Sequence, residues 1–150
     1  FGLRLFLNKQ LEDVTYYGMG PQESYRDKHR ASSHGMFKAK VFDMHEDYIR
    51  PQENGSHFDC DYVEITNGQF GFTAVSEKSF SFNASVYTQE ELEKADHNYM
   101  LEATESTVLC IDYALNGIGS NSCGPVVLDK YRFNDVEFDF TIKLIPYVKE

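Results

Sequence analysis

The 150-residue sequence contains no tryptophan, only three cysteines and four prolines, and 14 basic residues against 24 acidic ones. The resulting net charge of −10 argues against nucleic acid or anionic membrane as a partner, because both attract proteins through lysine and arginine. No apolar run approaches the roughly 20 residues of a membrane-spanning helix. Since exposed tryptophan is a common platform for a sugar face, its absence argues against an autonomous carbohydrate-binding module, although ten tyrosines leave that role open.

The sequence has three cysteines, Cys60, Cys110 and Cys123. This small, odd number suits free thiols better than the disulfide framework of a small secreted domain. Free thiols favour a reducing compartment, so the sequence predicts a cytoplasmic location and leaves a secreted or periplasmic one open. The chain starts at Phe1 inside a strand-like pattern, without a leader, and its natural N-terminus is expected elsewhere. We expect residues 1–150 to form a single domain with a buried core.

Short alternating apolar segments, separated by turn residues, predict an all-β fold of the antiparallel β-sandwich type. One short helix is expected at residues 88–94, where Thr88 and Glu91 have the spacing of a capping box. The glutamates of this helix are better explained as a solvated face than as a pair of catalytic carboxylates. The expected strands cover residues 3–7, 14–17, 36–42, 58–65, 70–75, 80–86, 99–103, 107–115, 126–133 and 136–145.

Residues 116–125, Asn-Gly-Ile-Gly-Ser-Asn-Ser-Cys-Gly-Pro, form the most site-like loop of the sequence. Gly117, Gly119 and Gly124 permit backbone angles closed to other residues, and successive amides in such a turn can point at one ligand atom. An ordinary glycine-rich connection between neighbouring strands is the plainer alternative, because such loops are common.

The side chains alone define no catalytic or metal centre. The five histidines, at positions 29, 34, 45, 57 and 97, lack the spacing of a zinc site, and the run Asp59-Cys60-Asp61 has the alternation of a strand. Cys123 would act as a nucleophile only beside a base that the sequence does not identify. From the residues alone, the chain is an acidic all-β domain with one suggestive loop.

Three segments together resemble successive motifs of the C-terminal β-sandwich domain of large β-galactosidases in glycoside hydrolase family 2. The first motif is residues 18–27 (Gly-Met-Gly-Pro-Gln-Glu-Ser-Tyr-Arg-Asp), the second is residues 48–55 (Tyr-Ile-Arg-Pro-Gln-Glu-Asn-Gly) and the third is residues 117–125 (Gly-Ile-Gly-Ser-Asn-Ser-Cys-Gly-Pro). Residues 87–92 resemble the short helix between the second and third motifs. The resemblance covers the whole chain and implies the C-terminal part of a galactose-mutarotase-like supersandwich, called the small chain or domain 5.

The resemblance also implies roles for individual residues. The loop that lines the substrate cleft would contain Asn121, Ser122, Cys123 and Gly124, where some relatives carry a tryptophan that packs against the sugar. Structural roles fall on Gly18, Gly20, Pro21, Glu23, Tyr25, Asp27, Pro51, Glu53, Asn54, Gly55, Gly117, Gly119 and Pro125. Glu23 and Glu53 are expected to anchor loops through hydrogen bonds or domain contacts.

The family implies retaining hydrolysis of terminal non-reducing β-D-galactose residues by two glutamates of a separate barrel domain, so no catalytic residue is expected in this chain. No metal or cofactor is expected on the chain itself, while magnesium and sodium are candidates for the parent enzyme. The expected partners are the other domains of the parent, the β-galactoside and further copies of the parent in a homo-oligomer. A free-standing lectin-like domain and a purely structural domain are the alternatives.

Overall fold

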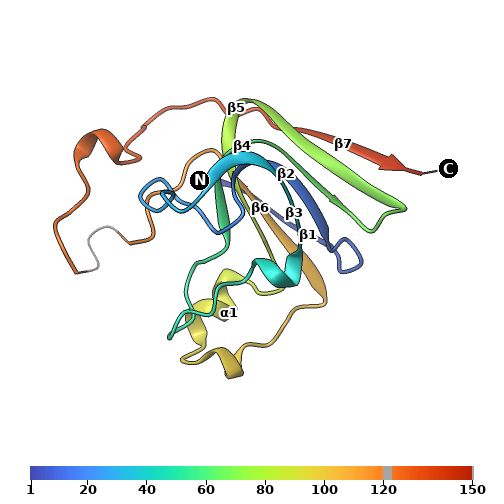
Figure 1. The fold of residues 1–150 in the computed structure, drawn as a ribbon, viewed down its shortest axis with the longest axis horizontal. Coiled ribbons are helices and arrows are strands. Elements are labelled where there is room, and N and C mark those ends of the chain that lie inside the picture. Colours follow the sequence, from blue (N-terminus) through green and yellow to red (C-terminus); the bar gives the residue numbers. More distant parts are fainter. Residues whose placement is uncertain (120–122, 150) are drawn as a thin grey trace.

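The computed structural model describes residues 1–119 and 123–149 (Figure 1). Its strands are β1 (Gly2–Asn8), β2 (Asp13–Gly20), β3 (Ser33–Lys40), β4 (Ser56–Thr66), β5 (Phe70–Ser85), β6 (Ser106–Asp112) and β7 (Lys143–Val148). The helices are α1 (Gln89–Lys94) and the 3-10 turns η1 (Val41–Met44), η2 (Asn98–Met100) and η3 (Asp129–Tyr131). This confirms the all-β class with one short α-helix.

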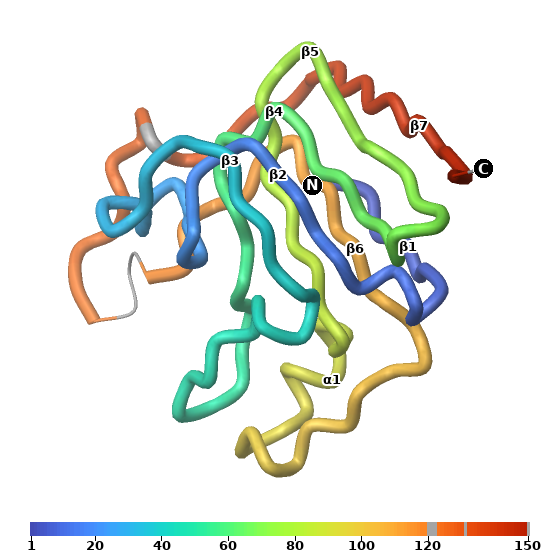
Figure 2. Tube along the Cα trace, turned by 45° about the vertical axis from the view of Figure 1, so that its right-hand side comes forward, coloured from blue at the N-terminus to red at the C-terminus, as the bar shows by residue number. Residues whose placement is uncertain are grey.

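The seven strands form one antiparallel sheet in the order β1-β6-β5-β4-β2-β3, and β7 also pairs with β5. Strand β5 is 16 residues long and shares one of its edges between two partners. Residues Ser81–Ser85 pair with β6, and residues Phe70–Val75 pair with β7. The sequence predicted two separate strands here, but the structure joins them into one continuous strand, whose course is clear in Figure 2.

The sheet bends around a single hydrophobic core. Side chains of both edge strands, Leu5 and Leu7 of β1 and Phe37 and Ala39 of β3, pack against the same buried cluster, which requires the sheet to curve. At the centre of this cluster the ring of Tyr16 lies 5.1 Å from that of Phe82 and 4.5 Å from that of His57. Burial lowers the pKa of His57 to about 4, so this histidine is a neutral part of the core at pH 7.

The predicted helix start is confirmed, because the Thr88 hydroxyl accepts a hydrogen bond from the Glu91 amide at 3.1 Å. The predicted hairpin is also confirmed, with Asn67 and Gly68 forming its turn between β4 and β5. Gly68 has a positive φ of 86°, the conformation that makes glycine favourable in such turns.

Two predicted strands are wrong, because residues 99–103 contain the end of η2 and residues 126–133 contain η3. The predicted strand at residues 136–145 is right only for its last three residues, which belong to β7, while residues 136–142 have no strand partner. In this last segment the half-buried Phe138, Phe140 and Ile142 alternate with exposed residues, and Phe138 stacks on Tyr113 at 4.5 Å. The alternation is therefore real, but it comes from packing on aromatic side chains and not from a hydrogen-bonded ladder.

No helix in the described part of the chain is long and apolar enough to span a membrane.

Candidate functional site

Glu23, in the first motif, connects that motif to the second one. Its side chain is almost completely buried, and Oε1 accepts hydrogen bonds from Lys28 Nζ and Tyr48 OH. Oε2 accepts the amide of Gly55 at 2.7 Å. Since both carboxylate oxygens are engaged and water is excluded, Glu23 holds the two ends of the second motif in place. Its expected role as a loop anchor is supported by these contacts.

Ser24 and Tyr25 strengthen the same junction by joining the first motif to the start of β4. The Ser24 amide donates to the Ser56 carbonyl at 2.7 Å, and the Ser24 hydroxyl accepts the Phe58 amide at 2.8 Å. The hydroxyl of the buried Tyr25 accepts the Ser56 amide at 3.3 Å. Sequence reasoning did not single out Ser24, because its partners Ser56 and Phe58 lie more than 30 positions away and leave no local signal.

Gly55 and Asn54 fix the end of the second motif. Gly55 has a positive φ of 71°, and a Cβ atom there would lie 2.5 Å from the carbonyl oxygen of Met44. The Asn54 side chain bonds to the Glu46 amide and to the Gln52 carbonyl, which holds the loop around it closed. Glycine is therefore required at position 55 by both backbone conformation and space.

Asp27, the last residue of the first motif, binds the third motif. Its carboxylate accepts the amides of Ile118 and Gly119 at 3.0 Å and 3.1 Å. In a loop of this sequence successive amides can point at one ligand atom, and the structure shows that these two meet a side chain of the same chain. The three motifs thus converge at the end of the sheet where β2 and β6 finish (Figure 1).

Gly117 is needed for this contact because the loop passes very close to Asp27. A Cβ atom at position 117 would lie 2.0 Å from the carboxyl carbon of Asp27. The predicted use of Gly117, Gly119 and Gly124 for unusual backbone angles is not what the structure shows. Among the described glycines, the positive φ values belong to Gly55 and Gly68. Close approach, and not backbone conformation, makes glycine necessary at position 117.

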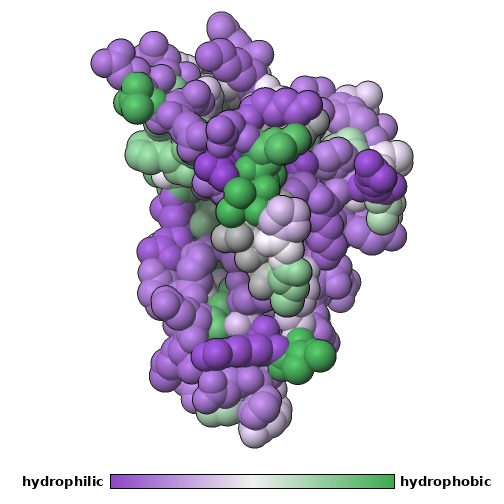
Figure 3. Space-filling view, turned by 90° about the vertical axis from the view of Figure 1, so that its left-hand side faces the viewer, coloured by the Kyte–Doolittle hydropathy of each residue, from purple (hydrophilic) through white to green (hydrophobic). Residues whose placement is uncertain are grey.

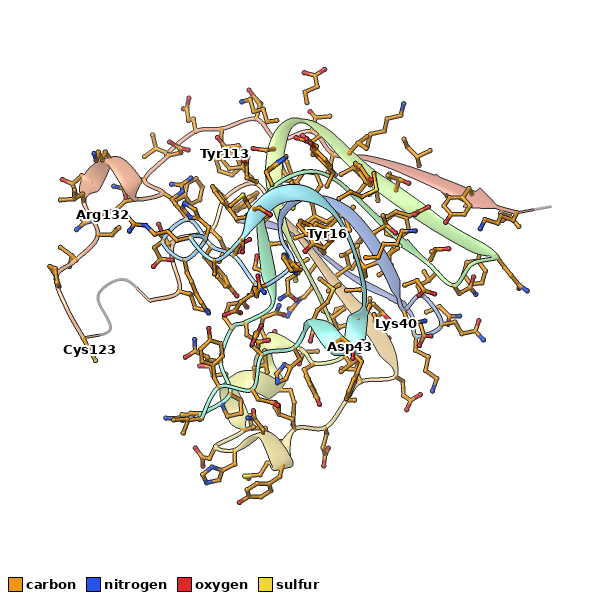
Figure 4. The ribbon with its side chains drawn as sticks, viewed as in Figure 1. Tyr16, Lys40, Asp43, Tyr113, Cys123 and Arg132 are labelled. Carbon is orange, nitrogen blue, oxygen red and sulfur yellow. The ribbon has the colours of Figure 1, made fainter. Side chains whose placement is uncertain are left out.

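The outer part of the third motif lies away from the sheet. Cys123 is exposed at the tip of the loop, far from Tyr113 in Figure 4. Gly124 and Pro125 are also exposed, and a Cβ atom at Gly124 would meet no atom within 4 Å. Asn121 and Ser122, which were expected to line a cleft, lie outside the described residues. The described tip is thus accessible to another domain or a ligand.

Other motif residues are structural. Gly18 and Gly20 allow close packing, since a Cβ atom would lie 2.3 Å from Cys60 Sγ at Gly18 and 2.2 Å from the Tyr16 hydroxyl at Gly20. Pro21 follows Gly20 through a cis peptide bond, and Pro51 is buried in the second motif.

Glu53 takes no part in the Glu23 junction. It lines a cavity of about 240 Å³ with Asp112, Arg4, Gln89 and Cys110 among its walls. Burial, with smaller contributions from Asp112 and Glu23, raises the pKa of Glu53 to about 7. Within the described residues its carboxyl group has no hydrogen-bond partner, so hydrogen bonding does not explain the expected anchoring role.

The raised pKa of Glu53 predicts a pH-dependent loss of stability. Its carboxyl has a pKa near 4.5 when unfolded and about 7 when folded, so the folded state binds more protons between these values and loses stability as the pH rises through them. Glu53→Gln is expected to raise the free energy of unfolding by about 2 kcal/mol at pH 8 and to have no effect near pH 4. Urea unfolding at both pH values measures this difference. The exposed Glu137→Gln serves as the control, and an equal effect of Glu53→Gln at both pH values would contradict the prediction.

The three cysteines are free. Burial raises the pKa of Cys60 well above its ordinary value and that of Cys110 to about 11, so neither thiol is ionised at neutral pH. Across residues 1–119 and 123–149, no three histidine, cysteine, aspartate or glutamate side chains gather as a metal site.

These contacts define a β-sheet domain that joins three loops through two carboxylates, the buried Glu23 and the exposed Asp27, and presents one of the loops at its surface. A comparison with protein families identifies the family to which this domain belongs. The chain belongs to the β-galactosidase small-chain family, whose profile matches residues 1–144.

Relatives in the same comparison are named β-galactosidase. The chain is 48% identical over 145 residues to that of Actinobacillus pleuropneumoniae, covering 97% of this chain and 14% of the relative. It is 45% identical over 147 residues to that of Staphylococcus xylosus, covering 97% and 15%. The Kluyveromyces lactis protein is 33% identical over 144 residues, covering 95% and 14%. The chain therefore corresponds to a small part of these much longer proteins, and its resemblance to a β-galactosidase small-chain domain is confirmed.

Proposed function

We propose that this chain is a non-catalytic domain of a retaining β-galactosidase of glycoside hydrolase family 2, which removes terminal non-reducing β-D-galactose residues. The observation that carries the proposal is the family match over residues 1–144, together with relatives named β-galactosidase of which the chain covers 14–15%. In this proposal the two catalytic glutamates belong to another domain. The magnesium and sodium ions of the parent, and its self-association, are likewise properties of the whole enzyme.

The environments of the two glutamates in the motifs support a non-catalytic role. Glu23 is 5% exposed and both of its oxygens accept hydrogen bonds from the chain itself. Glu53 lies in a separate cavity beside Asp112. A glycosidase needs two carboxyl groups on either side of one glycosidic bond, and the internal bonds of Glu23 prevent it from serving as one of them.

The proposed contribution of the domain is to place the loop of residues 117–125 against the substrate cleft. Asp27 fixes the start of this loop, and Asn116 fixes its return by accepting the Phe133 amide at 2.8 Å. Between these two attachments the tip with Cys123 is exposed. Such an arrangement suits a loop that contacts a molecule outside the domain.

Exposed apolar side chains support a second part of the proposal, which is packing against the other domains of the parent. Phe6 on β1, Met36 on β3 and Phe42 in η1 each expose more than half of their surface. Exposed aromatic and aliphatic groups of this size are typical of protein contact surfaces.

Cys123→Trp in the full-length parent enzyme tests the proposed loop role. An indole at the loop tip is expected to change KM for lactose and for aryl β-galactosides by about threefold or more, because aromatic packing adds binding energy. Leu128→Trp is the matched control, since Leu128 is also exposed but lies beyond the motif. Unchanged KM values for Cys123→Trp would show that the loop does not touch substrate. The 150-residue chain alone is expected to be inactive, and turnover by it would contradict the non-catalytic role.

A further inference from the structure

A second cavity lies beside the start of the third motif, separate from the one that contains Glu53. It has a volume of about 370 Å³ and is lined by Arg26, Asp27, His29, Arg30, Gly117 and Val127. This volume is within the range of about 300–1,000 Å³ that is usual for small-ligand sites. Two arginines and a histidine therefore line one cavity in a chain whose net charge is −10.

The charge of this cavity is positive. Of its lining residues in the described part of the chain, Asp27 is the single acid, and its carboxylate already accepts the amides of Ile118 and Gly119. The lining also contains Arg26 and Arg30, which are positively charged at every physiological pH. Although the chain as a whole is acidic, these two arginines favour an anion locally at this cavity.

Contacts with Tyr25, Lys28 and Phe58 hold one wall of the cavity. Tyr25 and Lys28 exchange two backbone hydrogen bonds of 2.8 Å and 3.0 Å, which closes a tight turn around Arg26 and Asp27. The His29 Nδ1 atom lies 2.9 Å from the Tyr25 carbonyl oxygen, and its ring packs against Phe58 at 5.7 Å. This bond leaves Nε2 as the His29 nitrogen that can meet a ligand. Because this wall is already fixed, the protein loses less conformational entropy when a ligand binds.

The loop between β6 and β7, which supplies Gly117 and Val127 to the cavity, lies at a mostly hydrophilic end of the molecule. Figure 3 views this end, which carries the loop between β6 and β7, and shows polar surface interrupted by a narrow apolar strip. Arg132 lies on the same loop, where its Nε donates to the Val127 carbonyl at 3.0 Å (Figure 4). A polar, positively charged cavity is suited to a hydrated anionic group and not to an apolar side chain.

We propose that this cavity binds a carboxylate, with Arg26 and Arg30 pairing with its oxygens and His29 contributing a further hydrogen bond. The planar guanidinium fork matches the geometry of a carboxylate. This part rests on the proposed function. Because the cavity lies beside the loop that is proposed to line the substrate cleft, the carboxylate belongs to the leaving group of an acidic β-galactoside. The same chemistry can come from an acidic side chain of another domain of the parent.

Direct binding is measured on the 150-residue chain with glucuronate as the probe. Saturable changes in the NMR signals of the Arg26 and Arg30 Nε–H groups and of the His29 ring are expected, with a Kd on the order of millimolar. Arg30→Gln is expected to weaken binding about fivefold, by loss of one charge-assisted pair. Arg50→Gln is the matched control, because the Arg50 guanidinium is exposed and lies 3.4 Å from Asp96, away from the cavity lining. Absence of saturable changes, or equal binding by Arg30→Gln and the unmodified chain, overturns the proposal.

The source of the carboxylate is then decided in the full-length parent enzyme. The probes are 4-carboxyphenyl and 4-carbamoylphenyl β-D-galactoside, which differ in charge and little in shape. If the carboxylate belongs to substrate, Arg30→Gln lowers the ratio of kcat/KM for the charged over the neutral probe about fivefold. If it belongs to another domain, that ratio is unchanged and the Tm of the parent falls. An unchanged ratio together with an unchanged Tm overturns a role for the cavity in the enzyme. A parent without galactosidase activity would refute the proposed function, while the glucuronate titration would still decide the cavity.

Discussion

Replacing Glu23 by alanine is expected to lower the free energy of unfolding of the chain by about 3 kcal/mol, since a buried hub of charge-assisted hydrogen bonds would be lost. The Glu23 side chain is 2% exposed, whereas that of Lys28 is 51% exposed. Lys28 can therefore regain water when its partner is removed. The Gly55 amide, which donates to Glu23 Oε2 at 2.7 Å in a buried position, cannot.

The loss should be concentrated at the junction of the first two motifs. Urea unfolding measures the loss in the free energy of unfolding. Hydrogen exchange at the Gly55 amide shows whether the loss is local to this junction, because this amide loses its acceptor in Glu23→Ala. Glu105→Gln is the control, since Glu105 pairs with Lys9 while 88% exposed and is expected to contribute little to stability. A Glu23→Ala chain as stable as the Glu105→Gln chain, with the Gly55 amide still protected, would show that Glu23 does not hold the second motif.

Local sequence signals were sufficient where the structure depends on neighbours in the chain. Thr88 and Glu91 lie three residues apart and form the predicted cap, and Asn67 with Gly68 forms the predicted turn. Alternation predicted partial burial correctly for Phe138, Phe140 and Ile142, but not for Val136, which is 97% exposed. It could not distinguish a strand from an extended segment, because hydrogen-bond partners are supplied by distant parts of the chain.

The contacts of the site depend on distant partners and show what a single sequence leaves undetermined. Glu23 was identified within a motif, but its pairing with Tyr48, 25 positions away, has no local signal. For the glycine-rich loop, the sequence left two interpretations open, an ordinary connection and amides that point at one ligand atom. That these amides meet the carboxylate of Asp27, some 90 positions earlier, follows only from the fold that brings the first and third motifs together. Motif resemblance located the residues, and the structure supplied their partners.

Replacing Asp27 by alanine in the full-length parent enzyme is expected to lower kcat/KM for β-galactosides by about 10- to 100-fold, because a loop displaced by even about 1 Å loses much of its contribution to positioning. Asp27 is exposed and belongs to no core cluster, so the stability of the chain should change little. Steady-state kinetics with lactose, together with urea unfolding, separates the two effects. Asp135→Ala is the control, since Asp135 is also exposed but lies outside all three motifs.

Gly117→Ala tests the same contact from the opposite side. Its new methyl group would lie 2.0 Å from the Asp27 carboxyl carbon, so the loop must move and activity should fall to a similar extent. In the double variant the clash is absent because the Asp27 carboxyl group has been removed, and its loss should be clearly smaller than the product of the two single losses. Multiplicative losses would mean that the two positions act independently, and unchanged kcat/KM in Asp27→Ala would mean that this contact does not position a loop used in catalysis. If the losses of kcat/KM in the two variants are coupled and the stability of the chain is unchanged, Asp27 acts on the substrate cleft through the loop that it holds.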